Sequence, residues 1–124
     1  MSITEIGREA EIKARVLLKK KGYEIFQSDW LGKKNGSWVN FEVKEKEMFK
    51  SPPFDGHGMD LYQVSKRMQF ERETGIKCLF IVFDKDNGKI FHQWLSHLEK
   101  QCHFTTRNNI RVYDLSDFDS IKYF

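Results

Sequence analysis

Residues 31–44 have the sequence LGKKNGSWVNFEVK, and this stretch decides the fold. Asn35 and Gly36 are a strong signal for a β-hairpin, because a type I′ turn needs a positive φ at both central positions and these two residue types tolerate it best. Apolar and polar residues then alternate over residues 38–44, which is the period of a half-buried strand. We therefore predict a hairpin that pairs this strand with one over residues 23–31.

The turn also fixes which residues of the two strands face each other. If its two central residues form the loop, Lys34 is paired with Ser37, and counting outward places Asp29 directly opposite Glu42. Opposite residues share a face of the sheet, with Cβ atoms about 4.5–5.5 Å apart. We therefore expect these two carboxylates to be neighbours.

Two carboxylates this close repel each other and destabilise a sheet unless a positive charge neutralises them. Oxygen ligands from one or two carboxylates, completed by water and phosphate, are the usual surroundings of Mg²⁺. Lys44 points to the same face as Glu42, about 7 Å further along the strand, where an ammonium group can orient a water molecule or offset charge on a phosphate. We predict a Mg²⁺ site that also accepts Mn²⁺, with Asp29 and Glu42 as ligands and Lys44 as a catalytic group.

Outward from the hairpin, the sequence predicts one α/β domain over residues 1–124, with a mixed sheet of four or five strands flanked by helices. Residues 4–21 have apolar side chains at helical spacing, and Gly22 ends this run. Residues 78–83 are almost wholly apolar, which is typical of a central strand covered on both faces. Further expected elements are a loop over residues 51–58 that can act as a lid and a second helix over residues 60–74. An antiparallel strand over 89–95, a short helix over 96–101 and a short strand over 110–113 follow.

The composition is that of a folded and slightly basic protein. Hydrophobic residues make up 40% and aromatic residues 15%, and the net charge of +3 suits a polyanionic partner without requiring one. Cys78 lies in the apolar strand and Cys102 belongs to no paired motif, so we expect a reducing compartment. No apolar run approaches the roughly 18 residues that cross a bilayer, and the N-terminus is too charged for a secretory signal, so we expect a cytoplasmic protein without a membrane partner.

Glu11 lies on the shoulder of the buried stripe of the first predicted helix, from which its carboxylate can reach the sheet. We therefore predict it as a further member of the site. Basic and polar residues in the hairpin tip, the following loop and the second helix flank the site, where they can bind phosphates without reading a base sequence. The candidates for nucleic-acid binding are Lys33, Lys34, Lys46, Lys50, Gln63 and Arg67.

These motifs together resemble those of the PD-(D/E)XK nuclease superfamily. The resemblance rests on the order Glu11-x-x-Ala14-x-x-x-Leu18-x-x-x-Gly22-Tyr23, then Asp29, then Phe41-Glu42-Val43-Lys44. Within the superfamily the chain is most similar to the RecU-type Holliday junction resolvases. These have a similar Asp-aromatic-x-Gly, a Phe-Glu-x-Lys, a loop with proline and phenylalanine, a helical glutamine like Gln63, and an apolar strand like Phe80-Ile81-Val82-Phe83. The resemblance implies a restriction-endonuclease-like core.

The resemblance also implies a function. It is that of a Mg²⁺-dependent endodeoxyribonuclease that hydrolyses phosphodiester bonds in branched DNA, such as four-way junctions, during DNA recombination and repair. It implies metal ligation by Asp29 and Glu42, often with the carbonyl of Val43, catalysis by Lys44 and support from Glu11. A homodimer is expected, because two symmetric strands must be cut in concert.

Other functions fit the same residues. A restriction- or phage-type nuclease would use them equally well on linear duplex DNA. A non-catalytic module with a nuclease fold would hold nucleic acid through its basic loops and keep the acids for stability. In an ordinary solvated surface, Lys44 and Glu42 would form an exposed ion pair of about 0.5 kcal/mol, Glu11 would pair with a neighbouring arginine, and the lysines would serve solubility.

Overall fold

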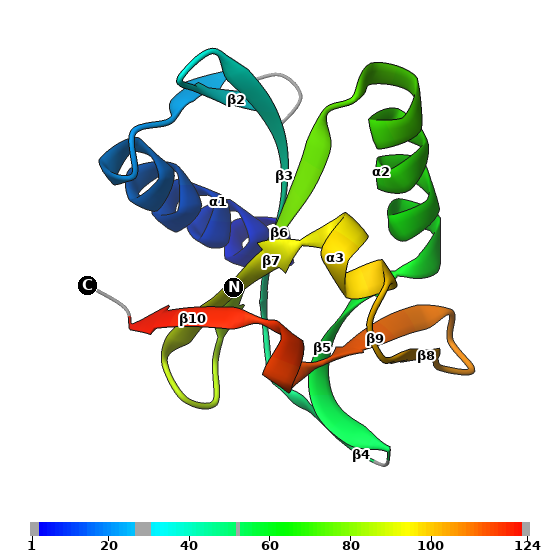
Figure 1. Ribbon diagram of the computed structural model, residues 1–124. Coiled ribbons are helices and arrows are strands. Elements are labelled where there is room, and N and C mark those ends of the chain that lie inside the picture. Colours follow the sequence, from blue (N-terminus) through cyan, green and yellow to red (C-terminus); the bar gives the residue numbers. More distant parts are fainter. Residues whose placement is uncertain (1–2, 27–30, 52, 123–124) are drawn as a thin grey trace.

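The main sheet has six strands in the order β1-β2-β3-β6-β7-β10. The computed structural model describes residues 3–26, 31–51 and 53–122 (Figure 1), and their side chains except those of 3–11, 24–26, 51 and 122. β3 and β6 are parallel, and the other neighbouring strands are antiparallel, so the predicted mixed sheet is confirmed and is wider than expected. The strands are β1 (Glu24–Phe26), β2 (Leu31–Lys34), β3 (Ser37–Lys46), β6 (Lys77–Asp84), β7 (Lys89–Trp94) and β10 (Asp119–Lys122).

The β2–β3 hairpin has the predicted turn. Asn35 has a φ of 52° and Gly36 a φ of 81°, as a type I′ turn requires. Pairing continues from the turn outward to Leu31, which faces Asn40. The register predicted from the sequence is confirmed as far as this pair.

The single strand predicted over residues 23–31 is wrong. β1 and β2 are antiparallel neighbours, and Phe26 is paired with Leu31, so the chain reverses direction between them. Residues 27–30 have the sequence QSDW, which contains neither the glycine nor the proline that usually indicates a reversal. Asp29 belongs to this stretch, outside the described residues, and its pairing with Glu42 stays a prediction.

α1 (Ile3–Lys20) covers one face of the main sheet. Its buried stripe packs against the odd-numbered residues of β3, including Phe41, and against Ile81 of β6. Gly22 follows the helix with a φ of 92°, a left-handed conformation that glycine adopts without strain, so the predicted end is confirmed. Among the described side chains of α1, residues 12–20, the buried ones are Ala14, Leu17 and Leu18.

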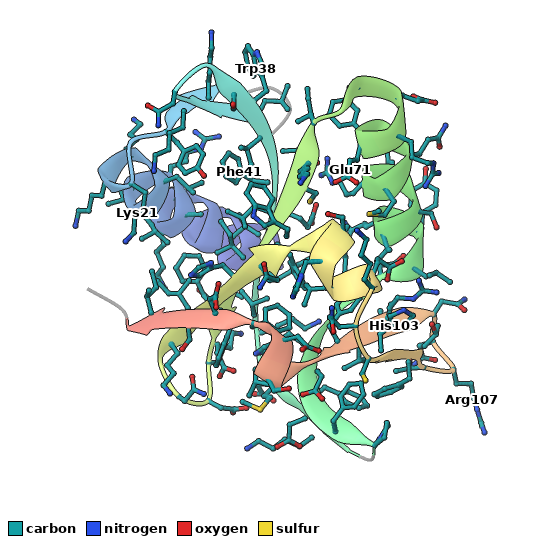
Figure 2. All side chains as sticks on the ribbon, in the orientation of Figure 1. Lys21, Trp38, Phe41, Glu71, His103 and Arg107 are labelled. Atoms are coloured by element: carbon teal, nitrogen blue, oxygen red, sulfur yellow. The ribbon has the colours of Figure 1, made fainter. Side chains whose placement is uncertain are left out.

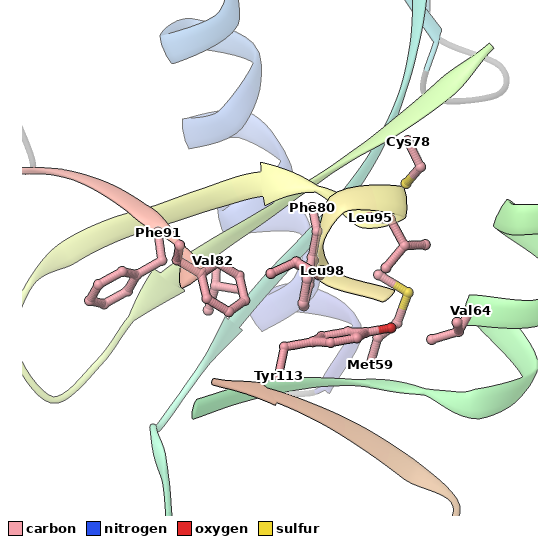
Figure 3. Packing of buried hydrophobic residues seen from close by; sticks show 10 residues of the cluster. Met59, Val64, Cys78, Phe80, Val82, Phe91, Leu95, Leu98 and Tyr113 are labelled. Carbon is pink, nitrogen blue, oxygen red and sulfur yellow. The ribbon is translucent and has the colours of Figure 1, made fainter. Parts of the chain in front are cut away.

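α2 (Leu61–Thr74) and α3 (Leu95–Glu99) pack on the other face, and α1 and α2 lie on opposite sides of β3 and β6 (Figure 1). The side chain of Asp60 caps α2 by accepting a hydrogen bond from the backbone nitrogen of Tyr62, and Gly75 ends the helix with a φ of 77°. This face has its own core, seen in Figure 3, which includes Val64, Phe80, Val82, Leu95, Leu98 and Tyr113.

A second sheet, in the order β4-β5-β9-β8, contradicts the loop predicted over residues 51–58. A Cβ atom at Gly56 would lie 1.9 Å from the carbonyl oxygen of Tyr113, so the glycine that indicated a loop instead lets two strands approach. A 3₁₀ helix, η1 (Leu115–Asp117), then leads into β10, and no helix among the described residues is long and apolar enough to cross a membrane. The strands are β4 (Phe49–Ser51), β5 (Phe54–Asp60), β8 (His103–Thr105) and β9 (Ile110–Asp114).

Candidate active site

Glu42 lies in the middle of β3, on the face of the sheet turned towards α2. Strand residues alternate between faces, so Asn40 and Lys44 share this face, whereas Phe41 packs on the α1 side. Glu42 is only 7% exposed, and its neighbour in β6 is the fully buried Phe80. A carboxylate in such a place is costly unless other groups pair with its charge.

Arg67 of α2 provides one such pairing. Its Nη2 and Nε atoms both donate to Oε2 of Glu42, at 2.8 and 3.2 Å, and its Nη1 donates to Oδ1 of Asn40 at 3.2 Å. One guanidinium group therefore makes three hydrogen bonds to two residues of β3. Arg67 was predicted to bind nucleic acid, and the contact with Glu42 was not foreseen.

Lys44 provides the second positive charge. Its Nζ lies 3.4 Å from Oε1 of Glu42, so the two carboxylate oxygens face two different cations. The side chain of Lys44 is 33% exposed, compared with 9% for Glu42, so the lysine is the more accessible of the two. The structure thus brings Glu42, Lys44 and Arg67 together, with the lysine on the accessible side.

Glu42 lies among both buried and charged side chains. Cys78 of β6 is next to Asn40, and the pKa of its thiol is raised to about 12, mainly by burial, while the charge of Arg67 opposes this rise and the charges of Glu42 and Glu71 add to it. Gln63, Arg67 and Glu71 follow each other at four-residue intervals along α2, which places them on one row of the helix. Figure 2 shows Glu71 on the side of α2 that faces β6. Within the part of the chain that is described, the buried Oε1 atoms of Gln63 and Glu71 have no hydrogen-bond partner.

The four lysines predicted to bind DNA lie near opposite ends of β3. Lys33 and Lys34 are in the hairpin next to its start, with their Nζ atoms 5.5 Å from the ring of Trp38 and 5.2 Å from that of Tyr23. Lys46 ends the strand, and its Nζ donates to the carbonyl of Gly58 at 2.9 Å. Burial, followed by the charge of Lys44, lowers the pKa of Lys46. The exposed Lys50 lies 4.0 Å from Asp86.

Glu11 belongs to α1, and the described contacts of that helix are with the other face of β3. On that face Lys13 pairs with the odd-numbered Glu45 at 3.2 Å. The side chain of Glu11 is outside the described set, so its place in the site stays a prediction. Its helix lies on the opposite side of the sheet from the Glu42 carboxylate.

A second buried polar pair, not predicted from the sequence, lies at the far end of β3 and β6. His57 of β5 and Asp84 of β6 are fully buried, with Nε2 of the imidazole 2.7 Å from Oδ2 of the carboxylate. The other oxygen of Asp84 accepts hydrogen bonds from the backbone nitrogens of Asp86 and Asn87. The pair joins the two sheets. His57 belongs to the stretch predicted as a loop, and it is buried because that stretch instead forms β5.

A cavity of about 410 Å³ opens on the α1 side of the main sheet. Its lining includes Leu17, Tyr23, His92, Trp94 and, of the predicted site residues that the structure describes, Lys34. Glu42, Lys44 and Arg67 face the other side of the sheet. The candidate active site is therefore a polar surface between β3 and α2, separate from this cavity.

The carboxylate of Glu42 fits a divalent cation, because it is held in one orientation beside the buried Phe80 and offers the hard oxygen ligands that such ions prefer. No group of three or more His, Cys, Asp or Glu side chains that could hold a metal occurs in the described ranges. A metal site at Glu42 would take Asp29, outside the described residues, as the predicted second carboxylate. It also needs a free oxygen on Glu42, where Arg67 and Lys44 now lie.

No protein-family model matches the chain, and no curated protein matches it by sequence. Among solved structures, the chain is similar to Hjc of Archaeoglobus fulgidus, a Holliday junction resolvase from an archaeal hyperthermophile. The TM-score is 0.60 at 14% sequence identity, over 90% of each chain. This likeness shows the fold, and the restriction-endonuclease-like α/β core predicted from the sequence is confirmed.

Proposed function

We propose that this protein is a metal-dependent nuclease that hydrolyses phosphodiester bonds in branched DNA. The observation that carries the proposal is the Glu42–Lys44 pair at 3.4 Å on one face of β3, in a fold shared with a Holliday junction resolvase. The motif alone is short. On the α2 side of the sheet, the carboxylate of Glu42 is buried and Lys44 is more exposed. Hydrolysis of a phosphodiester bond needs this arrangement of a fixed carboxylate and an accessible cation.

In this proposal, Glu42, Asp29 and the carbonyl of Val43 hold Mg²⁺ or Mn²⁺. The ion, when bound, supplies positive charge that stabilises the reacting phosphate. Lys44 orients the attacking water through its exposed ammonium group and donates to a non-bridging phosphate oxygen. Arg67 and the hairpin residues Lys33 and Lys34 contact phosphates on either side.

The direct test is a panel of labelled linear, flapped and four-way DNA, incubated with Mg²⁺ or Mn²⁺. We expect the wild type to cut the branched forms preferentially. Lys44→Ala and Asp29→Asn should lose cutting, whereas the matched control Lys66→Ala, an exposed lysine of α2, should not. Undiminished cutting by both site variants would contradict the proposal, and preference for linear DNA would favour a restriction- or phage-type nuclease.

One observation favours a second candidate function, a nucleic-acid-binding module without catalysis. Both oxygens of Glu42 already face cationic side chains, so the carboxylate has a structural role without any metal. A binding module predicts salt-sensitive DNA binding that does not depend on metal. Calorimetric titration with Mn²⁺ separates the two candidates, because the nuclease should bind the ion, as the free protein or in its complex with a four-way junction, and Glu42→Ala should lose this binding.

The proposal includes a homodimer, because a four-way junction has two symmetric strands to cut. Sedimentation equilibrium of the free protein, and of its complex with a four-way junction, measures this directly. Two protomers per junction are expected. A complex with a single protomer would remove the junction-resolving role and leave the nuclease proposal in place.

A further inference from the structure

Arg67 occupies the oxygen of Glu42 that a metal ion would need. Its Nη2 lies 2.8 Å and its Nε 3.2 Å from Oε2, while Lys44 faces Oε1 at 3.4 Å. A guanidinium group bound in this way blocks a divalent cation both by position and by charge repulsion across a site of low polarity. Glu42 therefore cannot bind a cation through Oε2 until Arg67 moves.

The side chain of Arg67 can exchange its contact with Glu42 for another anion. Its side chain is 25% exposed, so solvent and solutes can reach it, although Glu42 behind it is almost completely buried. A guanidinium group presents the same planar donors to a phosphate as to a carboxylate, and binds both in bidentate geometry. A DNA phosphate can therefore replace Glu42 as the partner of Arg67.

From these contacts we infer that Arg67 is a positioning residue that couples DNA binding to metal binding. This inference rests on the proposed nuclease function. Without DNA, Arg67 pairs with Glu42 and weakens the affinity of the site for a divalent cation. With DNA, Arg67 turns to a phosphate and Oε2 becomes free for the ion. Because such coupling is reciprocal, the ion also strengthens the binding of DNA.

The coupling keeps an ion from binding at Glu42 while Arg67 is still there. If Arg67 were simply absent, Glu42 would be a cation site at all times, whether or not a substrate was present. If Arg67 stayed on Glu42 while an ion bound, Lys44, Arg67 and the ion would place like charges around one carboxylate. Moving Arg67 to a phosphate removes one positive charge from this carboxylate and gives the guanidinium group an anionic partner of its own.

The test compares wild type with Arg67→Met in two measurements that do not depend on activity. Methionine keeps an unbranched apolar stem and removes the guanidinium group. Titration of the DNA-free protein with Mn²⁺ should show at least about tenfold tighter binding in the variant, within the usual range of coupling between sites. Binding of a four-way junction in EDTA, followed by fluorescence anisotropy, should be weaker in the variant, and its logarithmic salt dependence should be smaller by about one contact.

Tighter binding of Mn²⁺ together with weaker binding of DNA distinguishes the coupling from simpler roles of Arg67. A merely structural Arg67 would weaken both affinities, and a simple phosphate-binding Arg67 would weaken only that for DNA; either result overturns the inference. The control Arg72→Met, on the same helix and exposed, should leave the affinity for Mn²⁺ unchanged. Arg67→Gln repeats the test with a smaller loss of packing, and thermal unfolding verifies that each variant is folded.

The failure of this inference is distinguishable from the failure of the proposed function. Equal Mn²⁺ affinity in wild type and Arg67→Met overturns the coupling and leaves the nuclease proposal intact. Absence of Mn²⁺ binding in both proteins overturns both proposals. Binding seen only in the variant supports the coupling in its strongest form.

Discussion

Nε2 of His57 lies 2.7 Å from Oδ2 of Asp84, in a place where neither side chain has any exposed surface. Burial lowers the pKa of His57 below its usual 6.5, and the hydrogen bond and charge of Asp84 offset this only in part. In the unfolded chain the imidazole takes up a proton near its usual pKa. The folded protein binds fewer protons than the unfolded chain as the pH falls through this range.

We therefore expect the free energy of unfolding to fall between pH 7 and pH 5, with a slope of up to about 1.4 kcal/mol per pH unit from this group. Urea unfolding at several pH values measures it. His57→Gln should flatten the dependence without abolishing it, because burial also lowers the pKa of His92. The exposed His97→Gln is the control, and an unchanged slope in His57→Gln would show that this pair does not sense pH.

Lys44→Ala tests the chemical step. The lysine is partly exposed and makes one ion pair, so the stability of the variant should change by less than about 1 kcal/mol. Loss of a group that assists proton transfer typically lowers a rate about 10²–10⁴-fold. Single-turnover cleavage of a four-way junction measures the rate. A loss of stability as large as that of a core variant would instead assign Lys44 a structural role.

The Arg67–Glu42 contact should also be visible in stability. Arg67→Met leaves Glu42 with Lys44 as its remaining described cation partner, at a cost of about 1–3 kcal/mol. Glu42→Gln removes the buried charge and lowers the free energy of unfolding by an amount of its own. In the double variant, part of the cost should be recovered, because no buried carboxylate is left without its arginine. A double-mutant cycle from denaturant unfolding measures the coupling, and strictly additive costs would contradict the contact.

Gly56→Ala should disrupt the contact between β5 and β9. The new methyl group would meet the carbonyl oxygen of Tyr113, which is backbone and cannot turn aside. Overpacking of this kind costs about 1–3 kcal/mol or more. Asp55→Ala, at the exposed neighbouring position, is the matched control and should change the midpoint of thermal unfolding little. Equal midpoints for the two variants would be inconsistent with the close approach.

The two thiols should differ in reactivity. Cys102 is exposed, whereas Cys78 is 1% exposed and burial raises its pKa to about 12, so it has almost no thiolate at pH 8. Iodoacetamide should therefore modify Cys102 in the native protein and Cys78 only after unfolding. Mass spectrometry of the peptides measures each. Rapid labelling of Cys78 in the folded state would show that the region beneath Asn40 opens to solvent.

The parts of the fold that the sequence predicted are those set by local chemistry. Asn35 and Gly36 fix the β2–β3 register because their positive φ angles belong to the turn itself. The ends of α2 follow from the Asp60 cap and from Gly75. Such features depend on residues a few positions apart, which a sequence pattern records directly.

The parts that the sequence did not predict depend on contacts between distant segments. Arg67 and Glu42 are 25 positions apart and meet only because α2 packs on β6, the neighbour of β3 in the sheet. Gly56 is typical of a loop until β9 is placed against it.

The parallel pairing of β3 with β6 has a consequence for how the protein folds. The β2–β3 hairpin can form as soon as Asn40 has been synthesised, because its contacts are local. Glu42, however, gains its β6 neighbour Phe80 and its α2 partner only after the second sheet has begun and the helix has been made. Long-range parallel contacts form slowly. A nascent chain should therefore form the hairpin early, with the Glu42 carboxylate still hydrated, and bring Glu42, Lys44 and Arg67 together among the last steps of folding.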